Sequence, residues 1–195
     1  MLSHKESLNI LRKTNALLEG HFVLSSGLHS PKYVQCAKLL SFPNKANKIC
    51  KSLSSKIKKN FKNVNLILSP AVGGIIIGYE IGKLLNLETI FCERVNKKFK
   101  LRRGFSIKKN ARVVIVEDVV TTGKSSLECV KLIKEAKAKI LGFACIIDRS
   151  NKKNLKIKKK VISHLKINIP TYKKSELPPS LKSTPISVPG SRFIK

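Results

Sequence analysis

Residues 112–126 read RVVIVEDVVTTGKSS, and this stretch decides the fold. A run of β-branched apolar residues, typical of a buried strand, ends in two adjacent acids, Glu117 and Asp118. The chain then turns through Gly123 into a predicted helix that begins near Lys124. In such a unit the N–H groups of the turn and of the helix N-terminus converge on one anion, and glycine lets the backbone close around it. The stretch therefore predicts a cup for a monophosphate.

Side chains of the turn narrow the choice of ligand. The hydroxyls of Thr121, Thr122 and Ser125 add donors to the cup. Gly123, Lys124 and Ser125 copy the last three residues of a Walker P-loop, but the rest of that motif's spacing is missing. Two carboxylates would repel a polyphosphate unless they met sugar hydroxyls or Mg²⁺, so the acids favour a ribose between phosphate and metal. The alternative is an acidic strand end that caps an ordinary helix.

Strands and helices alternate on both sides of this stretch. Buried runs at 64–68, 89–92 and 140–147 alternate with helical patterns that end near Leu85 and span 125–136. Near-continuous β-branched runs separated by helices are typical of a parallel sheet covered on both faces. We therefore predict an α/β fold with a central, mainly parallel sheet flanked by helices, and with ligand-binding loops along one edge.

The two ends of the chain have different patterns. We predict an amphipathic helix over 1–20, a hairpin over 20–36 with a Ser-Ser-Gly turn, and a polar helix over 46–59. A strand is predicted at 161–167, followed by a tail with five prolines that we expect to be extended rather than helical.

The length of 195 residues suits one domain with a sizeable core. We expect a single domain over 1–195. Its core would span about 43–168, and a small N-terminal hood would comprise about 1–42 and part of the C-terminal tail.

The charge balance is strongly basic, with 40 Lys plus Arg against 11 Asp plus Glu, a formal charge of +29. Of the 40 basic residues, seven are Arg and 33 are Lys, and they spread along the whole chain. Because Arg makes the bidentate contacts with bases and phosphates, its scarcity argues against specific nucleic-acid binding. A positive field does suit an anionic small substrate.

The cysteines and the lengths of the apolar runs indicate the cellular compartment of the protein. The five cysteines are odd in number and show no C-x-x-C spacing, which favours buried free thiols in a reducing compartment. The N-terminus lacks the apolar core of a signal peptide, and no run of 18 apolar residues occurs. We expect a cytoplasmic protein without a membrane partner.

Two further segments are candidates for the site. The loop 69–74, SPAVGG, follows a predicted strand, and its glycines permit close approach to a second anion such as a diphosphate, although glycine pairs also occur where a helix packs on a strand. The segment 93–105 is rich in cations that could cover a diphosphate as a mobile lid, and an exposed hairpin is the equal alternative. Its cations are Arg94, Lys97, Lys98, Lys100, Arg102 and Arg103.

The segment VVIVEDVVTTG resembles the phosphoribosyl-diphosphate (PRPP) signature of type I phosphoribosyltransferases. The segment GHFVLSSGLHSPKYVQCAKLL is similar to the N-terminal hood of the orotate phosphoribosyltransferases. With ERVNKKFKLRRGFSI, IIDRS and the terminal PGSR, the resemblance runs in order from about Gly20 to Arg192.

The resemblance implies a Mg²⁺-dependent transfer of the phosphoribosyl group from PRPP to N1 of orotate, giving orotidine 5′-phosphate and diphosphate. It implies homodimers whose basic lid acts in the partner's site, and Mg²⁺ held mainly by PRPP rather than by a dedicated set of protein ligands. As catalytic groups it implies Glu117, Asp118, Arg102 and Arg103. For PRPP it implies the two acids with Val119, Val120, Thr121, Thr122, Gly123, Lys124, Ser125, Ser69, Ala71, Gly73, Gly74, Arg94, Lys97, Lys98 and Lys100. For orotate it implies Thr121, Arg149, Ser26, Gly27 and Tyr33, with Arg149 on the orotate carboxylate.

The sequence departs from the better-known branch of that family at three places. Ser25 stands where that branch has Lys, the lid has no His, and Lys124 occupies a position where we expect a small residue. Two alternatives therefore remain: a phosphoribosyltransferase for another base, and a PRPP-binding regulator without catalysis. Arg149 argues against another base, and the intact acids and lid argue against lost catalysis.

Overall fold

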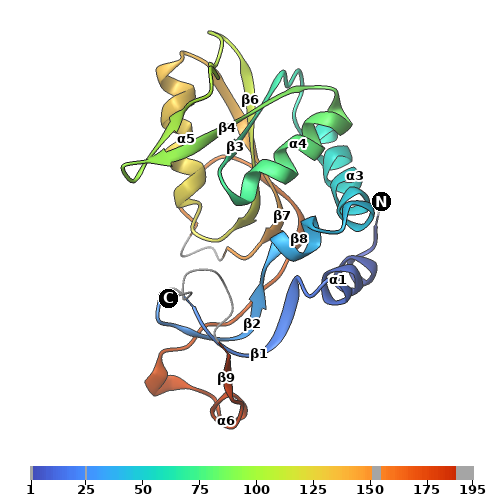
Figure 1. The fold of residues 1–195 in the computed structure, drawn as a ribbon, viewed down its shortest axis with the longest axis vertical. Helices are drawn as coiled ribbons and strands as arrows, with labels where there is room; N and C mark the ends of the chain where they lie inside the picture. The colour runs from blue at the N-terminus through green and yellow to red at the C-terminus, as the bar shows by residue number, and fades with distance from the viewer. Residues whose placement is uncertain (1, 25, 151–154, 188–195) are drawn as a thin grey trace.

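The computed structural model describes residues 2–24, 26–150 and 155–187, so Ser25 and the terminal PGSR lie outside the described residues. Figure 1 shows a core with a smaller unit at one end. The helices are α1 (His4–Lys13), α2 (Cys36–Leu40), α3 (Pro43–Asn60), α4 (Gly73–Leu85), α5 (Lys124–Glu135) and α6 (Pro179–Lys182), with a 3₁₀ turn η1 (Lys174–Glu176). The strands are β1 (Leu17–Val23), β2 (His29–Val34), β3 (Leu66–Pro70), β4 (Glu88–Val95), β5 (Lys98–Leu101), β6 (Arg112–Val120), β7 (Lys139–Asp148), β8 (Val161–Lys166) and β9 (Ile186–Ser187).

The core is a six-stranded sheet in the order β5-β4-β3-β6-β7-β8. Every neighbouring pair is parallel except β4 and β5, which form an antiparallel hairpin. Helices α3 and α4 cover one face and α5 covers the other (Figure 1). The predicted fold class is therefore confirmed.

Strand β6 shows why both faces are apolar. Val114 and Val116 pack into the cluster formed with α3 and α4, whereas Val113 and Ile115 pack into the cluster formed with α5. All four side chains are fully buried. Because successive side chains of a strand point to opposite faces, a continuous apolar run is what a strand covered on both faces requires.

Helix α3 confirms the predicted polar helix and extends it by three residues at its start and one at its end. Pro43 stands in its first turn, where the missing N–H costs no helical hydrogen bond. Ile49, Leu53 and Ile57 form its buried stripe at helical spacing, each with no exposed surface.

The smaller unit is a three-stranded sheet in the order β2-β1-β9. Strands β1 and β2 pair antiparallel, which confirms the predicted hairpin. Strand β9, from the C-terminal tail, joins β1 in parallel, with His21 opposite Ile186 and Phe22 opposite Ser187. This sheet lies beside the end of the core at which the parallel strands finish (Figure 1).

The N-terminal helix is shorter than predicted, since α1 ends at Lys13 and the following residues enter β1. The helix stops because Asn15 turns into the left-handed region with φ 54°, and the N–H groups of Asn15 and Ala16 then donate to the Arg12 and Leu11 carbonyls. Amphipathic spacing alone did not reveal this stop.

The tail also departs from the prediction, because η1 and α6 interrupt its extended course. Pro179 occupies the first turn of α6, a position that proline favours. Across residues 2–24, 26–150 and 155–187, no helix combines the length and apolarity needed to cross a membrane.

Candidate active site

The predicted phosphate cup lies where β6 turns into α5. Gly123 adopts a left-handed conformation with φ 74° and precedes the first residue of α5. A Cβ at this position would lie 2.6 Å from two carbons of Ile157, so glycine is required both for the turn and for space. The N–H of Lys156 donates to the Thr122 carbonyl at 3.1 Å, so the strand-like segment before β8 supports the cup from behind.

The two acids project from the end of β6 into this edge. Glu117 is buried and accepts a hydrogen bond from the Ser126 hydroxyl. Burial raises the pKa of Glu117 to about 7, with nearby Asp118 adding to the rise and the Ser126 hydrogen bond opposing it. Burial also raises the pKa of Asp118, while the Val119 N–H, 2.8 Å from Asp118 Oδ1, counteracts that rise. Consecutive side chains of a strand point to opposite faces, so Glu117 faces Ser126 of α5 and Asp118 lies against Gly73 of α4.

The second loop meets the first one at this edge. The Ala71 N–H donates to the Cys92 carbonyl at 2.8 Å, and the peptide bond between Ala71 and Val72 is cis. Gly73 begins α4 against Asp118, since a Cβ at Gly73 would lie 2.7 Å from Asp118 Oδ2. The structure thus brings the loop 69–74 onto the acidic end of β6, as expected for neighbouring parallel strands.

Arg149 follows β7 on the same edge. Its backbone N–H donates to the Val120 carbonyl at 2.8 Å, and its buried Nε has no hydrogen-bond partner among the described residues. Burial lowers the pKa of Arg149, and nearby Tyr33 and Cys36 oppose that fall. The Cys36 thiol lies 3.9 Å from the Asp118 carbonyl. A buried guanidinium nitrogen without a partner among the described residues is suited to an anionic ligand.

The hood contributes Tyr33 from β2 beside Arg149, whereas Ser26 and Gly27 lie at the tip of the hairpin. Gly27 has φ 78°, and its N–H donates to the Leu24 carbonyl at 2.8 Å. Of the three predicted hood residues, Tyr33 is therefore the one whose charge acts on Arg149.

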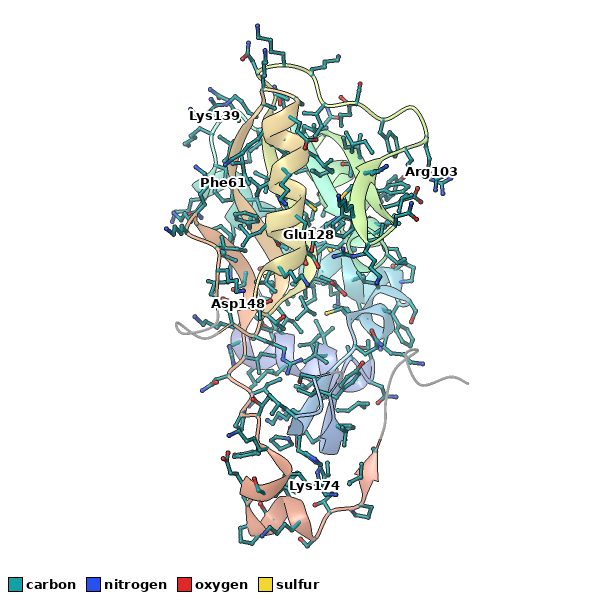
Figure 2. The ribbon with its side chains drawn as sticks, turned by 90° about the vertical axis from the view of Figure 1, so that its left-hand side faces the viewer. Phe61, Arg103, Glu128, Lys139, Asp148 and Lys174 are labelled. Carbon is teal, nitrogen blue, oxygen red and sulfur yellow. The ribbon has the colours of Figure 1, made fainter. Side chains whose placement is uncertain are left out.

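The basic segment 93–105 is a hairpin of β4 and β5 followed by a loop. Its arginines form ion pairs: Arg94 lies 2.7 Å from Glu128 of α5, and Arg103 and Arg102 lie 2.8 and 3.6 Å from the two oxygens of Glu93. Figure 2 shows Arg103 at the outer side of the hairpin, well away from Asp148 at the end of β7. Among the described residues, the carboxylates that these three arginines contact are therefore those of Glu93 and Glu128.

Four of the predicted lysines lie along one groove. Lys97, Lys98, Lys100 and Lys124 line a groove of about 980 Å³ between the hairpin and α5. Lys124 begins α5, so this groove adjoins the cup at one end. Its floor includes apolar side chains of β5, the following loop and α5.

Two residues at the site were not predicted, Ser126 and Cys36. The only sequence signal for Ser126 is a polar residue on the helix stripe that also carries Cys129 and Ile133. The sequence around Cys36 does not indicate a site residue, because apolar neighbours are common around any buried cysteine.

The described residues contain no group of three or more His, Cys, Asp or Glu side chains arranged to hold a metal ion. Mg²⁺ prefers oxygen ligands and commonly reaches proteins on substrate phosphates with one or two carboxylates nearby.

Comparison with known proteins identifies the family. The model of the phosphoribosyl transferase domain matches residues 40–183. The chain is 45% identical over 194 residues to an orotate phosphoribosyltransferase of Parvibaculum lavamentivorans, covering 99% of this chain and 100% of that protein. It is 43% identical over 194 residues to the orotate phosphoribosyltransferase of Phenylobacterium zucineum, with both chains covered completely.

Solved structures share the fold at lower identity. The orotate phosphoribosyltransferase of Aeropyrum pernix superimposes with a TM-score of 0.70 at 21% identity, over 82% of this chain and 92% of that one. The UMP synthase of Leishmania donovani gives a TM-score of 0.70 at 22% identity, over 83% of this chain and 36% of that one. Because a phosphoribosyl transferase domain model matches most of the chain and two full-length relatives are more than 40% identical to it, the chain belongs to the orotate phosphoribosyltransferase family.

Proposed function

We propose that this protein transfers the 5-phosphoribosyl group of PRPP to N1 of orotate, giving orotidine 5′-phosphate and diphosphate in pyrimidine biosynthesis. The choice of base rests on Arg149, whose buried Nε has no hydrogen-bond partner within the part of the chain that the structure describes. A planar guanidinium matches a carboxylate, and orotate has one whereas uracil and the purine bases do not.

The proposed roles follow the layout of the sheet edge. The cup of Val119–Ser125 would bind the 5′-phosphate through backbone N–H groups and hydroxyls. Glu117 and Asp118 would contact the ribose hydroxyls, and their negative charge would favour a cationic sugar as the glycosidic bond breaks. The loop 69–74 would receive the diphosphate end, and Arg149 would hold orotate in line for attack.

Mg²⁺ would enter on PRPP, where it would neutralise charge on the departing diphosphate. We assign it no protein ligand. The protein's own part in that step is to hold the sugar, the leaving group and the base in fixed relative positions.

We also infer a homodimer in which the basic hairpin serves the partner's site. Val72, Ile76 and Tyr79 are 82%, 54% and 65% exposed, and they form one apolar stripe along the first two turns of α4. An apolar stripe of this size favours a protein interface, and this one starts in the loop 69–74. A partner seated there would bring its hairpin close to the diphosphate end. Sedimentation velocity tests the dimer directly.

Five buried free cysteines support a reducing compartment, and we propose a cytoplasmic location on that ground.

A spectrophotometric assay of the purified chain with orotate, PRPP and Mg²⁺, coupled to diphosphate release, tests the function. Orotate should be consumed with stoichiometric diphosphate, and uracil and adenine should not react. Asp118→Asn should lower kcat by at least about 10²-fold with an unchanged circular dichroism spectrum, because it removes a charge facing the sugar. Reaction with another base in preference to orotate would contradict the assignment, and PRPP binding without any turnover would indicate a regulator.

A further inference from the structure

Ser126 occupies an unusual position in the first turn of α5. The buried residues of this helix are Ser126, Cys129 and Ile133, so a serine stands on the stripe that faces the sheet. Its exposed fraction is 0%, and its hydroxyl donates to Glu117 Oε1. The neighbouring Ser125 is half-buried on the side of the cup. The side chains of the two adjacent serines therefore lie in different environments: that of Ser126 is buried in the core, and that of Ser125 is partly exposed.

The helix itself gives no reason for serine here. Alanine in a helix is more favourable than serine by about 0.5 kcal/mol, and burial of a hydroxyl without a partner costs about 1–3 kcal/mol. A serine on a fully buried stripe is expected where its hydroxyl satisfies another buried polar group. Glu117 is the group that the Ser126 hydroxyl contacts.

Few other groups near Glu117 stabilise its negative charge. The titratable groups facing it are Asp118 on β6, Cys129 on α5 and Cys145 opposite it on β7. The pKa values of both thiols are raised, Cys145 mainly by burial and Cys129 mainly by its hydrogen bond with Cys92, so both are neutral. No lysine or arginine among the described residues forms an ion pair with Glu117. The Ser126 hydroxyl is the donor that the structure gives to this carboxylate.

The two acids are therefore supported from different elements. Asp118 accepts from the next N–H of its own strand, whereas Glu117 accepts from the helix that begins at the cup. Ordering of the first turn of α5 by a bound phosphate would also fix the donor to Glu117.

We propose that Ser126 is a positioning residue that holds the Glu117 carboxylate in its orientation and in its ionised form for contact with the ribose hydroxyls. The assignment rests on the proposed phosphoribosyl transfer, because it takes Glu117 as the group that meets the sugar. Ser126 does not touch the substrate. It acts through Glu117 and couples phosphate binding in the cup to the acid beside it.

The test is the pH profile of kcat/KM for PRPP in Ser126→Ala, Ser126→Thr and wild type. A hydrogen bond to a carboxylate favours the charged form, so its loss should move the acidic limb upward by about one pH unit, from near pH 7. Ser126→Ala should then be about 5-fold slower than wild type at pH 7 and within about 2-fold at pH 9. Ser126→Thr keeps the hydroxyl, so the midpoint of the acidic limb of its pH profile should equal that of wild type.

Ser52→Ala is the matched control, since Ser52 is a buried serine of α3 whose hydroxyl has no partner among the described residues. It should leave the profile unchanged. A Ser126→Ala profile with an unmoved midpoint, or a loss of equal size at every pH, would overturn the proposal.

Calorimetric measurement of Mg·PRPP binding over the same pH range distinguishes a failure of the proposed phosphoribosyl transfer from a failure of the proposed role of Ser126. If wild type consumed no orotate while the binding midpoint still moved in Ser126→Ala, the proposed function would fall and the role of Ser126 would stand. If wild type consumed orotate and neither midpoint moved, the role of Ser126 would fall alone.

Discussion

Substitution of Gly73 by alanine tests the contact between the two loops. Gly73 begins α4, and a Cβ there would lie 2.7, 2.9 and 3.0 Å from Oδ2, Cγ and Oδ1 of Asp118. Van der Waals contact requires about 3.5 Å, so the carboxylate must retreat by roughly 0.8 Å. That movement would disturb the 2.8 Å hydrogen bond from the Val119 N–H and displace Asp118 from the sugar.

The expected effect falls on activity rather than on stability. A misplacement of about 1 Å in a catalytic geometry costs on the order of 10²-fold, so kcat/KM for PRPP should fall by about that factor. Gly73 is not among the positive-φ residues, so alanine fits its backbone and gains up to about 1 kcal/mol of helix propensity. The free energy of unfolding should therefore stay within about 1 kcal/mol of wild type.

Steady-state kinetics, urea unfolding and a double-mutant cycle with Asp118→Ala form the assay. In the Asp118→Ala background the clash is absent, so adding Gly73→Ala should change Mg·PRPP affinity by less than about 2-fold. Near-normal activity of Gly73→Ala would refute the reasoning, as would an equal loss in both backgrounds.

Three further changes test other parts of the structure. Arg149→Ala should lower kcat/KM for orotate by about 10²-fold or more while PRPP affinity stays within about 2-fold, and equal losses for both substrates would contradict its role. Gly123→Ala should lower the free energy of unfolding by about 1–3 kcal/mol in urea, because φ is 74° and Ile157 lies 2.6 Å from the new Cβ, and an unchanged urea midpoint would be inconsistent. Burial, aided by Lys56, lowers the pKa of His164 to about 4. The unfolded chain therefore binds an extra proton between pH 6.5 and 4, and stability should fall by roughly 3 kcal/mol over that window as the pH decreases. His164→Gln should flatten this dependence in urea titrations, whereas an unchanged slope would assign the loss to other groups.

Much of the core could be predicted because its signals are local. The apolar run of β6, the stripe of Ile49, Leu53 and Ile57, and the turn at Gly123 each lie within a few residues of the chain. Periodicity and turn chemistry therefore indicated a parallel sheet covered on both faces and a phosphate cup at its edge. The end of α1 was missed because a left-handed Asn15, rather than a break in the apolar pattern, stops it.

Contacts between distant segments required the tertiary structure. Sequence named the acids and the cations, but it could not show that Glu117 is supported by Ser126, or that Gly73 lies against Asp118. Nor could it show that the lid arginines form ion pairs with Glu93 and Glu128, or that β9 returns to pair with β1. An apolar pattern determines which face of an element is buried, whereas the partner that each buried polar group meets depends on how the elements pack. The local sequence of residues 112–126 therefore predicts the cup. The protonation and the hydrogen-bond partners of Glu117 and Asp118 depend on how β6, α4 and α5 pack together.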